Sequence, residues 1–131
     1  MDEKLSISLP KGWEAKPTDT ISGFSGPNGE WVVVMAVPKG KYTQATWSAD
    51  AKSYWKQKGS ITATAASKVG GAKSSRVTHT FDMDGRPYFG IVEAFIHGDL
   101  AYDLEWWSPV GNEVADTATF QKVVDSAAFT N

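Results

Sequence analysis

The sequence predicts an α+β fold in which an antiparallel β-sheet is flanked by helices. Short alternating or β-branched segments recur along the chain and are joined by turn sequences, which favours antiparallel pairing. Two further segments carry apolar residues at helical spacing, so helices are expected to cover the sheet. No linker or shift in composition divides the chain, and residues 1–131 are therefore expected to form a single domain.

The N-terminal part of the chain is expected to form strands. Residues 4–9 alternate apolar and polar side chains, which is typical of a half-buried strand. The polar residues 16–20 predict a loop, and a short strand over 21–25 is expected before the turn sequence at 26–29. Residues 30–37 are β-branched at consecutive positions, which predicts a strand that is buried on both faces.

A first helix is predicted over residues 47–58. One of its faces carries five residues at helical spacing: Trp47, Ala51, Tyr54, Trp55 and Lys58. Thr46 or Ser48 is expected to cap the start of the helix, and Gly59 stands where a glycine commonly ends one.

The rest of the chain predicts an antiparallel meander followed by a second helix. Strands are expected over residues 61–69, 75–81, 88–97 and 100–107, with turns at 70–71, 82–87 and 98–99. Residues 117–127 predict the helix, with Asp116 as its N-cap. Phe129 is then expected to pack back onto the core.

Composition excludes several classes of function. Thirteen Lys and Arg against fifteen Asp and Glu give a net charge of −2, which argues against a nucleic-acid partner. The absence of cysteine excludes disulfide scaffolds, thiol catalysis and cysteine-ligated zinc. No run approaches the roughly 18 apolar residues of a membrane-spanning helix, so no transmembrane segment is expected.

The first residues, Met1-Asp2-Glu3-Lys4, are acidic and polar and do not form a signal peptide. Two interpretations of the compartment remain open. In the first, the chain is cytoplasmic as written. In the second, it is the mature part of an exported protein, and a lipidated leader that is absent from this sequence would attach the natural protein to a membrane. The missing cysteine fits both interpretations, because a lipoprotein's anchoring cysteine would leave with that leader.

Four short segments occur in an order that resembles a known superfamily. They are Ile7-Ser8-Leu9-Pro10-Lys11-Gly12-Trp13, Val69-Gly70-Gly71-Ala72-Lys73, Ala101-Tyr102-Asp103-Leu104 and the segment from Phe120 to Phe129. Together they resemble the PsbP-like α-β-α sandwiches, which include DcrB-type and LpqN-like bacterial lipoproteins and certain type VI secretion effector chaperones. The resemblance carries no catalytic motif.

The resemblance implies a non-enzymatic binding or accessory domain of a bacterial envelope or exported protein, with another protein as its partner. The same superfamily implies an alternative, an intracellular chaperone or adaptor that holds a hydrophobic segment of a client and exposes an apolar surface as a dimer. Neither interpretation requires a cofactor, and none is predicted.

A third interpretation is a metal-binding or enzymatic protein. Two histidines and three carboxylates on the predicted strands are the residue types that bind zinc or iron: His79, Glu93, His97, Asp103 and Glu105. They lack the close spacing of a metal motif, and a polar outward or rim-facing strand face is the favoured explanation. Glu93 with Asp103 or Glu105 would form a general acid–base pair. A buried ion pair between Glu93 and Arg76 is the favoured alternative.

The six tryptophans include the dipeptide Trp106-Trp107, whose side chains must point to opposite faces of a regular strand. With Tyr88 and Tyr102 nearby, this dipeptide predicts an exposed aromatic platform for binding a protein or a sugar. In the alternative, both tryptophans are covered because the sheet is sandwiched between layers.

Overall fold

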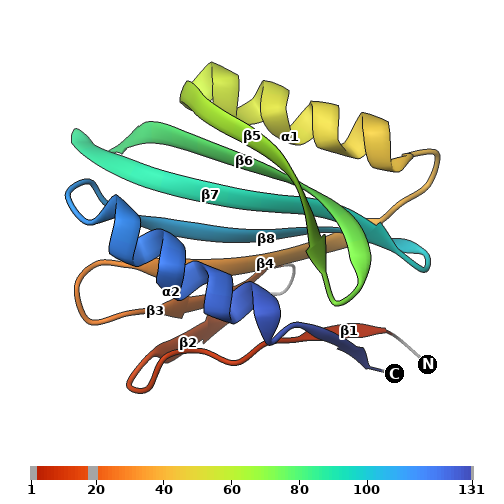
Figure 1. Cartoon of the computed structure of the whole chain (residues 1–131), viewed down its shortest axis with the longest axis horizontal. Helices are drawn as coiled ribbons and strands as arrows, with labels where there is room; N and C mark the ends of the chain where they lie inside the picture. The colour runs from red at the N-terminus through yellow and green to blue at the C-terminus, as the bar shows by residue number, and fades with distance from the viewer. Residues whose placement is uncertain (1–2, 18–20, 131) are drawn as a thin grey trace.

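The computed structural model describes residues 3–17 and 21–130, and its centre is a seven-stranded antiparallel sheet (Figure 1). The strand order is β2-β3-β4-β8-β7-β6-β5. The strand bounds are β2 Glu14–Pro17, β3 Ile21–Ser25, β4 Trp31–Pro38, β5 Gly59–Val69, β6 Ala72–Met83, β7 Arg86–His97 and β8 Leu100–Pro109. The predicted α+β class with an antiparallel sheet is confirmed.

Two helices cover parts of the opposite faces of this sheet. Helix α1 (Gln44–Lys58) contacts β5, β6 and β7 on one face. Helix α2 (Glu113–Asp125) packs Phe120, Val123 and Val124 into the core on the other face. Helix α1 thus lies towards the β5 edge and contacts β5, β6 and β7 more than β4 and β8, and this asymmetry positions the candidate site.

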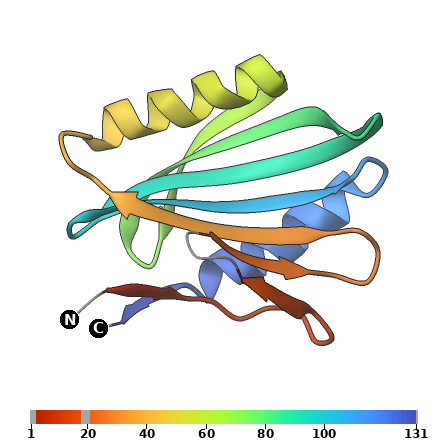
Figure 2. The same ribbon diagram turned by 180° about the vertical axis from the view of Figure 1, so that it is seen from behind.

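The two ends of the described chain lie side by side. Strand β1 (Lys4–Ser6) pairs antiparallel with β9 (Ala128–Thr130) in a separate two-stranded sheet (Figure 2). Phe129 of β9 stacks on His97 with ring centroids 3.7 Å apart. Phe129 therefore packs back onto the sheet as expected, although β9 itself was not predicted and β1 is shorter than the predicted strand.

Both helices begin earlier than predicted. Thr43 caps α1, because its hydroxyl accepts the amide of Thr46 while the Thr46 hydroxyl accepts the amide of Thr43. Thr46 and Ser48 therefore lie inside the helix. Asp116 also lies inside a helix, where it accepts a hydrogen bond of 2.7 Å from Ser108 instead of capping α2. The first turns of both helices contain charged or polar residues, so the spacing of apolar residues does not indicate where the helices start.

The loop predicted at residues 16–20 is wrong in its first part, because β2 extends through residue 17 and pairs with β3. Residues 18–20 lie outside the described residues. The strand predicted over 30–37 is confirmed as β4, and it is buried on both faces as expected, since Val32 and Val33 are both buried.

Gly59 ends α1 and begins β5 in a single residue. Its φ of −174° is extended, so the left-handed backbone expected of a helix-ending glycine is absent. A Cβ at this position would instead lie 1.9 Å from the carbonyl oxygen of Thr80 in β6. Glycine is therefore required because two backbones approach closely.

We expect Gly59→Ala to destabilise the fold by about 3 kcal/mol, because the added methyl group must separate β5 from β6. Ser60→Ala, at the exposed next position, should change the free energy of unfolding by less than about 0.5 kcal/mol. Urea unfolding of both variants measures this difference. Equal free energies of unfolding for the two variants would show that β5 and β6 can separate to accommodate the methyl group without loss of stability.

Candidate functional site

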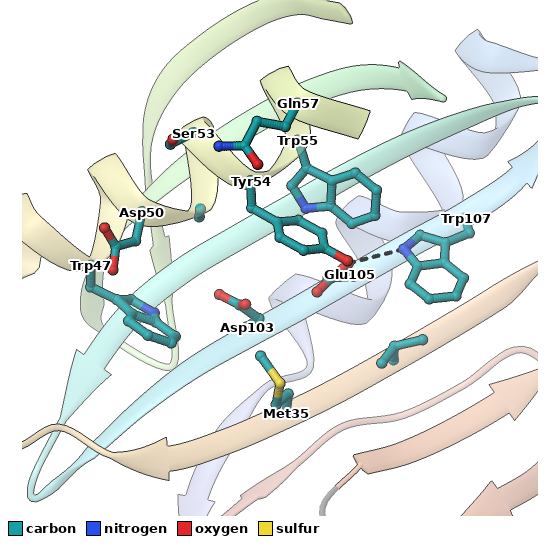
Figure 3. Close-up of a pocket in the computed structure, with 12 residues that line it drawn as sticks. Met35, Trp47, Asp50, Ser53, Tyr54, Trp55, Gln57, Asp103, Glu105 and Trp107 are labelled. Atoms are coloured by element: carbon teal, nitrogen blue, oxygen red, sulfur yellow. Dashed lines mark hydrogen bonds between the residues drawn. The ribbon is translucent and has the colours of Figure 1, made fainter. Parts of the chain in front are cut away.

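A pocket of about 540 Å³ lies between α1 and the strands β4 and β8 (Figure 3). Val33 and Met35 of β4 form part of its floor, and the side of α1 forms its wall. Pockets that hold small molecules in proteins commonly have volumes of about 300–1,000 Å³, so this one has room for a small ligand or for a side chain of a partner.

Aromatic side chains form most of the wall. Trp47 and Trp55 come from α1, Trp107 comes from β8, and Tyr54 stands at the rim with 52 % of its surface exposed. The indole of Trp55 stacks on His79 with ring centroids 4.0 Å apart. The indole N–H of Trp47 donates to the carbonyl of Tyr102 at 2.8 Å. The ring stacking fixes the position of Trp55, and the hydrogen bond fixes that of Trp47.

Two carboxylates lie at the base of this aromatic wall. Asp103 and Glu105 are two positions apart on β8, so both side chains point to the α1 face of the sheet (Figure 3). Only 9 % of Asp103 and 7 % of Glu105 is exposed. Glu105 accepts a hydrogen bond of 2.9 Å from the indole N–H of Trp107, whereas Oδ1 of Asp103 is buried without a hydrogen-bond partner.

Burial disfavours the charged forms of both groups. It raises the pKa of Asp103 to about 7. Burial also raises the pKa of Glu105 to about 8; the negative charge of Asp103 adds to this increase, and the hydrogen bond from Trp107 opposes it. The pocket therefore contains two carboxyl groups that bind protons near neutral pH, an unusual arrangement that is enriched at functional sites.

The aromatic platform predicted from the sequence does not form. Trp106 and Trp107 do point to opposite faces, as expected, but Trp106, Tyr88 and Tyr102 are buried at 1 %, 6 % and 1 % exposure. Trp106 packs under α2 against Phe120. The sheet is covered on that side, Tyr88 is buried against Phe81 on the opposite face, and of the four predicted aromatic residues only Trp107 lines the pocket.

The five polar residues considered as a metal or catalytic cluster are divided between the two faces of the sheet. His79, Asp103 and Glu105 lie on the α1 face, whereas Glu93 and His97 lie on the α2 face, as the strand register requires. The described residues contain no group of three or more His, Cys, Asp or Glu able to hold a metal ion. The pairing of Glu93 with Asp103 or Glu105 is likewise excluded, and only Asp103 and Glu105 come together.

The favoured structural interpretation of Glu93 is confirmed. Its side chain is fully buried and forms an ion pair with Nε of Arg76. Ser74 donates a hydrogen bond of 2.7 Å to the same carboxylate, and Ser67 donates another of 3.3 Å. Arg76 in turn donates to Gln121 of α2 at 2.7 Å, so this pair joins the sheet to the helix.

His79 is buried in the aromatic cluster behind Trp55, and neither ring nitrogen has a hydrogen-bond partner. Burial lowers its pKa to about 4, so the ring is neutral at physiological pH. A Cβ on Gly90 would lie 2.4 Å from the His79 ring, which shows how closely the two strands enclose it. His79 supports Trp55 and does not reach the pocket.

No protein-family model and no curated protein sequence matches the chain. Solved structures do share its fold. LpqN of Mycobacterium tuberculosis, described as involved in cell envelope biogenesis, superposes with a TM-score of 0.81 over 99 % of this chain and 85 % of LpqN, at 11 % identity. The chain thus has the LpqN fold.

Two further structures are more distant. A Bacteroides thetaiotaomicron protein has a TM-score of 0.64 and 14 % identity, with 97 % of this chain and 45 % of that protein covered. The Pseudomonas aeruginosa protein PA94, of unknown function, has a TM-score of 0.64 and 10 % identity, with 93 % and 80 % covered. The LpqN part of the predicted resemblance is confirmed as a fold, and the PsbP, DcrB and chaperone parts stay predictions.

Within the described ranges, no helix has both the length and the apolar character needed to cross a membrane.

Proposed function

We propose that this chain is a non-enzymatic binding domain of a bacterial envelope protein and that the pocket between α1 and β8 holds its ligand. The observation that carries the proposal is the pocket itself, in which three aromatic side chains surround two buried carboxyl groups. Concave, largely apolar sites with a few convergent polar groups are typical of ligand binding. The envelope assignment draws on the shared fold with LpqN, whose structure is described in those terms.

Indole N–H signals in the ¹⁵N NMR spectrum test the pocket directly. With a library of small aromatic and aliphatic fragments as probes, we expect binders to shift the signals of Trp47, Trp55 and Trp107. The signals of Trp13 and Trp106, which contact each other outside the pocket, should not move. If no fragment shifts the three pocket signals selectively, the proposed site is wrong.

A matched pair of variants strengthens this test. Met35→Trp should fill the pocket from β4 and abolish the selective shifts, because Met35 lies on the floor. Met83→Trp makes the same substitution at the far end of β6 and should leave them intact. Binding that survives Met35→Trp would place the fragments elsewhere.

Acid–base catalysis is the second candidate function, because the pKa values of Asp103 and Glu105 near neutral pH suit proton transfer. A panel of chromogenic glycosides and esters tests it. Under the binding proposal, turnover by the chain equals that of an Asp103→Asn/Glu105→Gln variant. Turnover that this variant loses would favour an enzyme and contradict a purely binding role.

The chaperone alternative requires an extended exposed apolar surface. Among the residues that the structure describes, the exposed large apolar side chains are Tyr42, Tyr54, Val110 and Val114. The two tyrosines belong to α1 and the residues before it, and the two valines lie at the β8–α2 connection. These side chains are too few and too dispersed to support that alternative.

Fractionation of cells expressing the full natural protein tests the envelope assignment, which recovery in the cytosol alone would contradict.

A further inference from the structure

The charge of the pocket indicates what it binds. Three carboxylates line it, namely Asp50, Asp103 and Glu105, and no described lining residue is Lys, Arg or His. Asp50 stands at the exposed rim and accepts a hydrogen bond of 2.6 Å from the hydroxyl of Tyr42. The two carboxyl groups of β8 are the ones that lie inside. When these carboxyl groups are ionised they repel an anionic ligand and attract a cation.

The buried oxygen of Asp103 gives a second, independent indication. Asp103 is 9 % exposed and lines the pocket, yet its Oδ1 has no hydrogen-bond partner in the protein. Buried polar oxygens in folded proteins are nearly always paired, because an unpaired one loses its hydration without compensation. A ligand with an N–H donor at the base of the pocket would supply the missing partner once the carboxyl group turns about its Cβ–Cγ bond to present this oxygen.

The walls favour an organic cation over a metal ion. Trp47, Trp55 and Trp107 present aromatic surface around the carboxyl groups, and aromatic rings attract organic cations through their faces. Two carboxylates alone make a poor metal site, and among the described residues neither Asp50 at the rim nor any other His, Cys, Asp or Glu joins them in a group able to hold a metal ion.

We infer that the pocket binds an ammonium group carried on an apolar body, with the ammonium hydrogen-bonded to Asp103 and Glu105 and the apolar body packed against Trp55 and Trp107. The inference rests on the proposed function of the pocket and specifies its ligand. The ammonium can belong to a free amine or to a lysine side chain of a partner protein, since both present the same chemistry.

Binding of such a cation is coupled to the release of protons from the two carboxyl groups. The other titratable groups that face the pair are Asp50 and Tyr54 from α1, while the pocket-lining residues of β4 are apolar. On β7, Ala94 and Val92 lie beside Asp103 and Glu105, and neutral His79 of β6 lies behind Trp55. Without ligand, the raised pKa values keep both carboxyl groups largely protonated below about pH 7. A bound cation favours the charged forms, so affinity should increase with pH and protons should be released.

Two probes of nearly identical shape test the inference. Phenethylammonium is cationic, and 2-phenylethanol replaces its ammonium with a neutral hydroxyl. Titration followed by the indole signals of Trp47, Trp55 and Trp107 should show at least about ten-fold tighter binding of the cation at pH 8.5. This preference should fall to about two-fold or less at pH 5.5, where the carboxyl groups are neutral.

Isosteric variants assign the preference to the two carboxyl groups. Asp103→Asn/Glu105→Gln should bind both probes equally while retaining the affinity for 2-phenylethanol, which shows that the pocket is still formed. Asp116→Asn removes a partly buried carboxylate outside this pocket and should keep the wild-type preference. Should the double variant fold poorly, Asp103→Asn alone must reduce the preference.

The outcomes separate this inference from the proposed function. Equal binding of the two probes in the wild-type pocket, or a preference that survives the double variant, would overturn the ammonium ligand while leaving the pocket as a binding site. A lack of binding by both probes and by the fragment library would overturn both proposals. Nα-acetyl-lysine methylamide distinguishes the sources: affinity matching phenethylammonium supports a partner's lysine, and at least ten-fold weaker binding supports a free amine.

Discussion

The Asp103→Asn/Glu105→Gln variant is expected to lose a pH dependence of stability that the wild-type chain shows between about pH 4 and about pH 9. Burial raises the pKa of Asp103 from 3.8 to about 7 and that of Glu105 from 4.5 to about 8. The native state therefore binds more protons than the unfolded chain over this range, and stability must fall as pH rises. Below about pH 4 the two groups are protonated in both states and impose no penalty.

The magnitude is large for a protein of this size. The increase in the pKa of Asp103 alone corresponds to roughly 4 kcal/mol at high pH, and we expect a combined difference of a few kcal/mol between wild type and variant. Urea unfolding at pH 4 and at pH 9 measures it. The readout is the difference between the two pH dependences, which removes any fixed effect of the amides. Parallel pH profiles would show that the two groups are not buried as described.

Arg76→Met is expected to destabilise the fold by about 3–5 kcal/mol, because it leaves the fully buried carboxylate of Glu93 without its cation. The hydrogen bond from Arg76 to Gln121 of α2 is lost at the same time. The two serines that also donate to Glu93 cannot neutralise its charge. Chemical denaturation at neutral pH measures the effect.

The chain offers a matched control, because Arg86 is its only other arginine and lies exposed at the start of β7. Arg86→Met should change the free energy of unfolding by less than about 0.5 kcal/mol. Adding Glu93→Gln to Arg76→Met should recover part of the lost stability, since it removes the unpaired charge. Equal effects of the two Arg→Met substitutions would contradict a buried ion pair.

The elements of the fold could be predicted from the sequence where local patterns determine them. The β-branched residues of β4 and the hairpin turns of the meander identify their strands because strand period and turn chemistry are local properties. The pairing of β1 with β9 joins residues from opposite ends of the chain. It depends on tertiary packing, which no local pattern reports.

The site was harder to predict than the fold for a related reason. The sequence identifies Asp103 and Glu105 as members of a polar group and Trp107 as a member of a separate aromatic group. Trp47 and Trp55 share one helical face, which in a helix that covers a sheet usually indicates packing and not a ligand site. Only the lateral position of α1 on the sheet places these tryptophans over β8, and no residue pattern in the helix specifies that position.

The alternation along β8 was nevertheless an available signal. Asp103, Glu105 and Trp107 occupy every second position, so they had to share one face of the strand. Two carboxyl groups and an indole on one face of a central strand are unusual, because the core positions of such strands are normally apolar. A buried polar face of this kind indicates a site more directly than the total number of tryptophans.

The central claim is that the pocket between α1 and β8 is a ligand site, and a crystal structure of the chain grown with phenethylammonium tests it most directly. We predict the aromatic ring against Trp55 and Trp107, with the ammonium nitrogen about 2.7–3.2 Å from a carboxylate oxygen of Asp103. A pocket that stays empty under saturating phenethylammonium, or a ligand that lies outside it, would contradict the account.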